Sequence, residues 1–306
     1  MAPGTADANG DDTADGTVVD ETQADESDGD DASDERRLFE KNRPETAAFV
    51  ASNLGVTRIS LAGDRVGQFT LAHRCTARSV AVNDALVVGT DDDVLVSGGD
   101  AFESTGFGPA VAVGAHEGTI YAATDDGRVA RAPVDARSGD AWETVGEVED
   151  PRRFDANLLA AADGVFRVET DGTLSDLGLE AANDVARAAS LAGGGPVAAT
   201  DDGVYRYDGE WIREIEGTAT WVAGDGETTI AAVDGELCES VDGNWTSRPL
   251  PVAEEIADLA RGESSYAITD AGTMLVHADP AVTDDGQGGW RSQAVGVRGV
   301  VEMAIR

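Results

Sequence analysis

A unit of two short apolar runs joined by an Asp-containing turn recurs along the chain and constrains the fold more than any other feature. Its copies lie between residues 49 and 277. The aligned turn residues are Asn53, Asp91, Asp125, Asp163, Asp201, Asp234 and Asp270. Neighbouring turns are 33 to 38 residues apart, which is typical of propellers and solenoids.

The apolar runs predict β-strands rather than helices. They are five to seven residues long, they are rich in Val, Ile, Tyr and Thr, and Asp-Gly turns separate them. Each unit divides into four strands, which we name A to D from the inside outward. For one unit we expect strand A at 186–193 and strands B to D at 196–200, 203–207 and 210–215.

The two ends of the chain predict a closed ring. The first unit begins at its B strand, and the last residues, 299–306, resemble an A strand with nothing after it. Closure removes the sheet edges that an open array would expose. We therefore predict an all-β fold, a seven-bladed β-propeller of four-stranded antiparallel blades whose first blade is closed by the C-terminal strand.

The domain boundaries follow from composition. Residues 1–35 consist almost entirely of small, polar and acidic residues and cannot bury enough apolar surface to order themselves. We predict a disordered acidic tail at 1–35, a short lead-in at 36–46 and the propeller at 47–306.

Tryptophan recurs at the start of the predicted D strands. An aromatic binding belt and packing between blades both explain such a pattern, and we favour packing, because one aromatic at a fixed place in each blade is common in propellers. The residues are Trp142, Trp211, Trp245 and Trp290.

The charge excludes several classes of partner. The chain has 59 acidic and 22 basic residues, a formal net charge of −37. Residues 1–35 hold 13 acidic and no basic residues, so the remainder keeps 46 acidic against 22 basic ones, a net charge of −24. Such a body repels nucleic acid and anionic lipid, and it is most stable where concentrated salt screens its self-repulsion. We therefore expect a salt-rich cytoplasm.

The compartment is also indicated by cysteine usage. The two cysteines, Cys75 and Cys238, lie in different repeats, which favours reduced thiols inside a cell. No signal peptide and no apolar run of membrane-spanning length is visible. We expect a cytoplasmic monomer that binds neither membranes nor nucleic acid.

The repeats resemble a known group of proteins. IYAATDDGRVARA (120–132) and VAATDDGVYRYDGEW (197–211) are similar to the repeats of regulator-type and kelch-like propellers. Residues 36–306 as a whole resemble a family of uncharacterised haloarchaeal β-propeller proteins. The resemblance implies a propeller in a halophilic cytoplasm and implies no activity and no site residues.

The sequence offers little catalytic or metal-binding chemistry. The histidines, His73, His116 and His277, lie in three different units, and His73 and Cys75 are too close in the chain for a typical Cys-His nucleophile. The aspartates lack calcium-loop spacing and suit turns instead. We predict no metal site, no cofactor and no catalytic residues.

Arginines in the D–A connections are the most specific functional feature. They are Arg74, Arg78, Arg152, Arg153, Arg187 and Arg298. D–A and B–C connections share one face of a propeller, so the arginines could pair with the turn aspartates or form a site for an anion or an acidic partner at the channel mouth.

The sequence therefore favours a non-enzymatic platform for protein interactions. The alternative is an enzyme or small-molecule binder that holds an anionic ligand at the channel mouth. Fold alone does not separate the two, because propellers host both roles.

Overall fold

The structure, a computed structural model, describes residues 46–98, 101–187, 195–241, 243–278 and 288–306. The predicted tail at 1–35 and nearly all of the lead-in lie outside these residues. Twenty-eight strands and one short 3-10 helix, η1 (Gly139–Ala141), make up the described chain. The strands of the first half are β1 (Thr46–Ser52), β2 (Gly55–Ala62), β3 (Arg65–His73), β4 (Ala77–Val82), β5 (Leu86–Thr90), β6 (Val94–Ser97), β7 (Phe102–Ser104), β8 (Ala112–His116), β9 (Thr119–Ala123), β10 (Arg128–Pro133), β11 (Glu143–Glu147), β12 (Pro151–Asp155), β13 (Leu158–Ala161) and β14 (Gly164–Val168).

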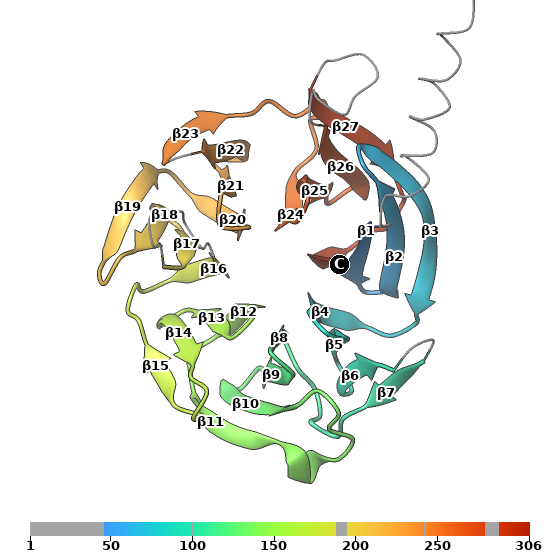
Figure 1. Cartoon of the computed structure of the whole chain (residues 1–306), viewed down its shortest axis with the longest axis vertical. Coiled ribbons are helices and arrows are strands. Elements are labelled where there is room, and N and C mark those ends of the chain that lie inside the picture. The colour runs from blue at the N-terminus through green and yellow to red at the C-terminus, as the bar shows by residue number, and fades with distance from the viewer. Residues whose placement is uncertain (1–45, 99–100, 188–194, 242, 279–287) are drawn as a thin grey trace, which may run out of the picture. The chain divides into compact units, whose positions relative to one another are not determined.

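The second half completes the ring that Figure 1 shows from one face. Its strands are β15 (Leu174–Asp176), β16 (Ala182–Ala186), β17 (Val197–Thr200), β18 (Gly203–Tyr207), β19 (Trp211–Glu216), β20 (Ala219–Gly224), β21 (Thr228–Val233), β22 (Glu236–Val241), β23 (Asn244–Ser247), β24 (Ile256–Arg261), β25 (Ser265–Thr269), β26 (Thr273–Ala278), β27 (Gly289–Ala294) and β28 (Val300–Ile305).

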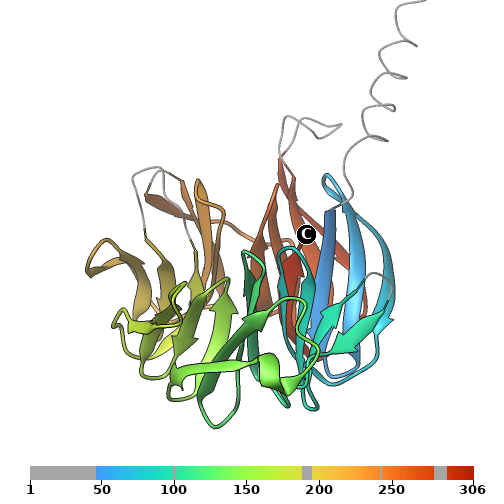
Figure 2. The same ribbon diagram turned by 60° about the horizontal axis from the view of Figure 1, so that its bottom comes forward.

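The strands form seven antiparallel sheets of four, which confirms the predicted seven-bladed propeller. Blade 1 has the order β28-β1-β2-β3, so the C-terminal strand is its innermost strand, as predicted. Blades 2 to 7 take four consecutive strands each, beginning with β4, β8, β12, β16, β20 and β24. These first strands and β28 surround the central channel, and the connections gather on two opposite faces (Figures 1 and 2).

The core is divided among the seven interfaces between neighbouring blades. Each interface holds one cluster of buried apolar side chains, because every sheet presents alternate residues to the blade on either side. All four recurring tryptophans pack against such clusters, which confirms the expectation of inter-blade packing. Trp211, for example, also donates from Nε1 to the Leu177 carbonyl of the preceding blade, at 2.7 Å.

Glycine in the B–C turns allows close approach of the next D–A connection. Gly127 has a φ of 94°, and a Cβ there would lie 2.1 Å from the Val148 carbonyl oxygen. Gly272 has a φ of 82°, and a Cβ on this residue would lie 2.0 Å from the Val297 carbonyl oxygen. The Asp-Gly signal in the sequence thus marks the places where backbone packs on backbone.

One predicted strand is wrong in its position. In blade 5 the innermost strand is β16, at 182–186, instead of 186–193. Two polar residues, Asn183 and Asp184, interrupt the apolar pattern of this strand, and both side chains hydrogen-bond within the inner part of the ring. Most of the residues predicted as strand A, 188–194, lie outside the described chain.

Candidate functional site

The centre of the channel is occupied by Arg153, the third residue of β12. Its guanidinium forms a bidentate pair with Asp258 of blade 7, at 2.6 Å from Nη1 to Oδ1 and 3.2 Å from Nη2 to Oδ2. Nη2 also donates to the Val301 carbonyl at 2.8 Å, and the group lies 4.4 Å from the centre of the Trp221 ring. Arg153 therefore spans the channel from blade 4 to blades 7, 1 and 6.

Arg153 belongs to a ring of residues at the same level in all seven innermost strands, which we call the channel belt. In every blade except blade 3 the belt residue directly follows a shift in strand register. Such bulges re-aim a side chain, here toward the channel. From blade 1 to blade 7 the belt consists of Glu302, Ser79, Ala112, Arg153, Asp184, Trp221 and Asp258.

Belt side chains also join neighbouring blades. Four of them accept a hydrogen bond from a backbone N–H of the following blade, so a buried donor in that blade is satisfied. The pairs are Asp258 with Met303, Glu302 with Val80, Ser79 with Val113, and Asp184 with Val222.

The belt contains more acidic than basic side chains. Three buried carboxyl groups, Asp184, Asp258 and Glu302, face the single guanidinium of Arg153. Burial raises the pKa of Asp184 to about 8 and that of Glu302 to about 7, although the Arg153 charge opposes both shifts. Burial lowers the pKa of Arg153, but the carboxylates outweigh it and raise the pKa overall. Near neutral pH the belt therefore keeps protons on part of its carboxyl groups, which reduces its excess negative charge.

The belt closes the channel between two cavities. Arg153 and Glu302 line cavities on both sides of this level, one opening at each face. We call the openings the D–A mouth and the A–B mouth, after the connections that surround them. Each face therefore presents its own cavity to a ligand or partner.

The D–A mouth leads to a cavity of about 450 Å³ and brings together three of the six predicted arginines, Arg78, Arg152 and Arg153. Arg78 pairs with the turn residue Asp91 at 2.5 Å. Arg152 pairs with Asp150 at 3.2 Å and donates to Asn183 at 2.8 Å. Arg78 and Arg152 keep 52% and 30% of their side chains exposed, whereas Arg153 keeps 9%.

Arg187 lies at the A–B mouth, contrary to the predicted arrangement, because it follows β16 instead of preceding the innermost strand. The cavity there measures about 460 Å³. The Arg187 backbone N–H donates to Asp155, and its Nη1 lies 3.1 Å from His116 Nδ1. Burial raises the pKa of Asp155. Across the mouth, Arg261 pairs with Asp225 at 2.9 Å.

The remaining predicted arginines, Arg74 and Arg298, are exposed residues of D–A connections. Arg74 lies between β3 and β4, and Arg298 between β27 and β28. Neither lines the cavity at the D–A mouth. The structure thus gathers half of the predicted set at one opening and leaves its anion-binding role a prediction.

The turn aspartates take part in hydrogen bonds between connections. Asp163 accepts from the Glu149 N–H at 3.0 Å, and Asp234 accepts from the Thr218 N–H at 2.9 Å. These contacts fit the turn chemistry expected from the sequence.

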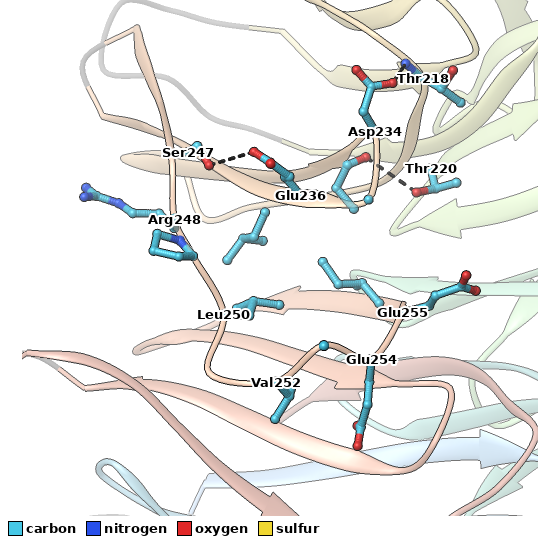
Figure 3. Close-up of a pocket in the computed structure, with 16 residues that line it drawn as sticks. Thr218, Thr220, Asp234, Glu236, Ser247, Arg248, Leu250, Val252, Glu254 and Glu255 are labelled. Carbon is cyan, nitrogen blue, oxygen red and sulfur yellow. Dashed lines mark hydrogen bonds between the residues drawn. The ribbon is translucent and has the colours of Figure 1, made fainter.

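A further groove lies between blades 6 and 7, under the long connection from β23 to β24. It encloses about 630 Å³. Figure 3 shows the apolar side chains of Leu250 and Val252 beside the carboxylates of Glu236 and Glu254. Ser247 donates to Glu236 at 3.0 Å and Thr269 to Glu254 at 2.6 Å. Because both carboxylates are held by their own neighbours, the groove offers no assembled reactive group.

The described residues assemble neither a group of metal ligands nor an activated thiol. No three His, Cys, Asp or Glu side chains within it are grouped to hold a metal ion. The His73 ring packs on Phe102, 4.7 Å between ring centres. Burial raises the pKa of both Cys75 and Cys238, so neither is an activated thiol. No helix in the described residues is long and apolar enough to cross a membrane.

Sequence reasoning missed the acidic part of the belt. Asp184, Asp258 and Glu302 each stand in front of an apolar residue and an alanine, in DVA, DLA and EMA. Ser79 in SVA and Trp221 in WVA have the same setting. Aligning the inner strands on this pattern would have placed five of the seven belt positions at one level.

Comparison with solved structures shows the fold alone. A computationally designed protein, Ika8, superposes with a TM-score of 0.54 at 16% identity, covering 84% of this chain and 90% of its own. The WD40 β-propeller domain of Doa1 superposes with a TM-score of 0.56 at 13% identity, covering 74% of this chain and 84% of its own. The extracellular domain of the putative hybrid two-component system BT4673 from B. thetaiotaomicron superposes with a TM-score of 0.56 at 12% identity, covering 81% of this chain and 44% of its own.

Sequence comparison identifies the family of the chain. No curated protein is significantly similar to the chain. The model of the family described as Beta-prop_HVO_0234-like, beta propeller, matches residues 32–306, which include the whole described ring. The chain therefore belongs to the HVO_0234-like family of β-propellers.

Proposed function

We propose that the chain is a non-enzymatic platform for protein interactions and that acidic side chains of a partner dock at the D–A mouth. The closure of the channel by Arg153 is the observation that carries this proposal. The charged groups deepest in the channel bind one another, so they are not arranged around an empty reaction site. What the ring offers to other molecules is its two faces and its rim.

The arginines of the D–A mouth are suited to a second acidic partner. Arg78 uses only Nε in its pair with Asp91, and Nη2 of Arg152 makes no hydrogen bond within the described chain. A guanidinium has several N–H donors, so both can bind a further carboxylate. On a body with a net charge of −24, such a local cationic site would steer an acidic partner to one place.

The surroundings of the protein form part of the proposal. We infer a salt-rich cytoplasm, because concentrated salt screens the repulsion within an acidic body. The platform would act there as a monomer, since copies with the same large negative charge repel one another. The WD40-like fold is compatible with this role, although fold does not assign function.

The direct test is affinity purification from a native lysate at about 2 M KCl, comparing the parent with the double variant Arg78→Ala/Arg152→Ala. We expect the parent to recover a defined partner and the variant to lose at least about tenfold of it. Arg137→Ala/Arg248→Ala is the matched control, because both residues are exposed and pair with a glutamate away from the mouth.

Recovery of the same partner by the parent and the mouth variant would contradict the proposed docking site. Recovery of no specific protein by the parent would contradict the platform itself. The free energies of unfolding of all three proteins must agree within about 1 kcal/mol for the comparison to report on binding.

A second candidate function is favoured by the A–B mouth. Arg187 and Asp155 line a 460 Å³ cavity, and His116 contacts Arg187 beside it, an arrangement that could hold a small anionic ligand. Thermal shift with a panel of carboxylates and phosphates tests this alternative. A shift that Arg187→Ala abolishes would support it over the platform.

A further inference from the structure

The outer strand of blade 1, β3, differs from the other outer strands. It has nine residues, whereas the other six have between three and six. Among the described strands it pairs with β2 alone, so its other edge faces outward. Its residues 66–72 carry no charge. Edge strands are usually shortened or charged to prevent pairing with other chains, and this central stretch has neither protection.

Two large apolar side chains of β3 are exposed. Phe69 and Leu71 each keep 46% of their surface accessible. They lie opposite Ile59 and Thr57 on β2, and hence on one face of the sheet. That face is turned toward blade 7, because Ile59 packs in the cluster between blades 7 and 1. β27, the outer strand of blade 7, lies beside β3 there.

This part of the rim is poor in acidic residues, although Asp64 directly precedes β3 and pairs with Arg291 at 3.7 Å. Residues 65–83 contain no acidic residue in a chain that has 59, and residues 288–301 contain none either. Arg65 begins β3, and Arg74 directly follows it. We therefore expect an acidic protein to be repelled less along β3 than by the rest of the body.

We propose that the β3 edge receives an extended segment of a partner protein as a fifth strand of blade 1. Main-chain hydrogen bonds to the outer edge of β3 would supply affinity. Apolar side chains at alternate positions of the segment would pack on Phe69 and Leu71, and acidic residues near its ends would meet Arg65 and Arg74. This inference rests on the platform role proposed above and adds a second docking surface to it.

A second copy of the chain fits this edge less well. Antiparallel pairing of two β3 strands would bring Arg65 of one copy near His73 and Arg74 of the other. It would also bring together two bodies of the same large negative charge. An acidic segment with an alternating apolar pattern avoids both penalties.

The test is selection of a displayed library of random peptides, about twelve residues long, against the full chain in about 1 M KCl. We expect enrichment of peptides with alternating apolar residues and flanking Asp or Glu. The double variant Phe69→Glu/Leu71→Glu should bind the selected peptides at least about tenfold more weakly. Ile212→Glu is the control, since Ile212 is 40% exposed on the outer strand β19 and should leave binding unchanged.

Hydrogen exchange on the parent gives a readout that does not depend on the variants folding. A bound peptide should slow exchange of amides within residues 66–72, because strand addition protects the edge. Enrichment of basic peptides, absence of enrichment, or protection only elsewhere would overturn the proposal. Slow exchange at β3 in concentrated protein without peptide, removed by the double variant, would assign the edge to self-association instead.

The failure of the β3 inference can be distinguished from the failure of the platform role. If Arg78→Ala/Arg152→Ala loses lysate partners while Phe69→Glu/Leu71→Glu retains all of them, the platform stands and the β3 inference is wrong. If the parent recovers no partner at all, the platform role itself is wrong.

Discussion

Arg152 and Arg153 are neighbours in sequence and lie in opposite environments. Arg153 points into the channel belt and is 9% exposed, with a bidentate carboxylate partner. Arg152 lies at the D–A mouth, is 30% exposed and shares its donors among Asp150, Asn183 and a carbonyl. Strand alternation, together with the bulge at residues 151–153, separates the two side chains.

The difference shows that burial, and not residue type, decides what an arginine does in this ring. Both arginines suit carboxylate recognition, but only the exposed one can change partners without leaving a buried charge unpaired. In the account proposed here the belt holds the blades together, and a partner binds at the mouth, where an exposed arginine can change partners at little cost. The same distinction holds between the buried Asp258 and the exposed Asp91, the partners of Arg153 and Arg78.

The largest effect should come from breaking the belt and the ring together. Deleting residues 300–306 removes Glu302 and the Val301 carbonyl that holds Arg153, and it leaves β1 without its inner neighbour. We expect aggregation or loss of the cooperative unfolding transition, because a sheet edge becomes exposed. Size-exclusion chromatography and urea unfolding measure this, with deletion of Arg306 alone as the control. A monomeric protein as stable as the parent would show that closure is not required.

Added salt should change the contribution of the surface charges to stability much more than the contribution of the belt. Raising KCl from about 0.1 M to about 2 M should stabilise the parent by roughly 3–5 kcal/mol, as screening weakens the repulsion of the acidic body. The loss caused by Arg153→Met should stay constant over the same range, because buried pairs are screened much less. Urea unfolding at each salt concentration gives both values. Stability of the parent that does not depend on salt would contradict the halophilic interpretation.

A smaller effect should appear in the pH dependence of the belt. The folded-state pKa of Asp184 is raised to about 8, so its protonated form favours folding and its contribution is lost as the pH rises from about 4 through about 8. Relative to Asp184→Asn, the parent should therefore lose about 1–3 kcal/mol between about pH 5 and about pH 9.

Asp201→Asn at the exposed mouth serves as the control for this titration. Parallel stability curves for the parent and Asp184→Asn would show that Asp184 is ionised in the fold throughout this range.

The fold could be predicted almost completely because its determinants are local. Each Asp-Gly turn and its flanking apolar runs specify a hairpin, and the unmatched ends at Ala47 and Val300 specify closure. The position of β16 could not be predicted in the same way. Its pattern is polar where Asp184 faces the channel, and that role depends on Val222, which is distant in sequence.

The candidate site was only partly predictable for a related reason. The arginine-rich segments predicted as D–A connections do lie near one face, but the structure places Arg78 within β4 and Arg152 within β12 instead of in the connections before them. The sequence pattern does not distinguish Arg152 from Arg153, since their burial depends on a bulge and on Asp258, more than a hundred residues away. Arg187 fell on the other face because the strand before it was misplaced by a few residues.

The most direct test of the account compares Arg153→Ala with Arg152→Ala by urea unfolding at neutral pH in about 2 M KCl. Removing Arg153 leaves the belt carboxyl groups without their cation and should cost about 3–5 kcal/mol. Removing Arg152 should cost less than about 1 kcal/mol, because its pair is exposed. Equal and small losses would contradict the claim that Arg153 closes the channel as part of the fold. Equal and large losses would contradict the claim that the D–A mouth is available for binding.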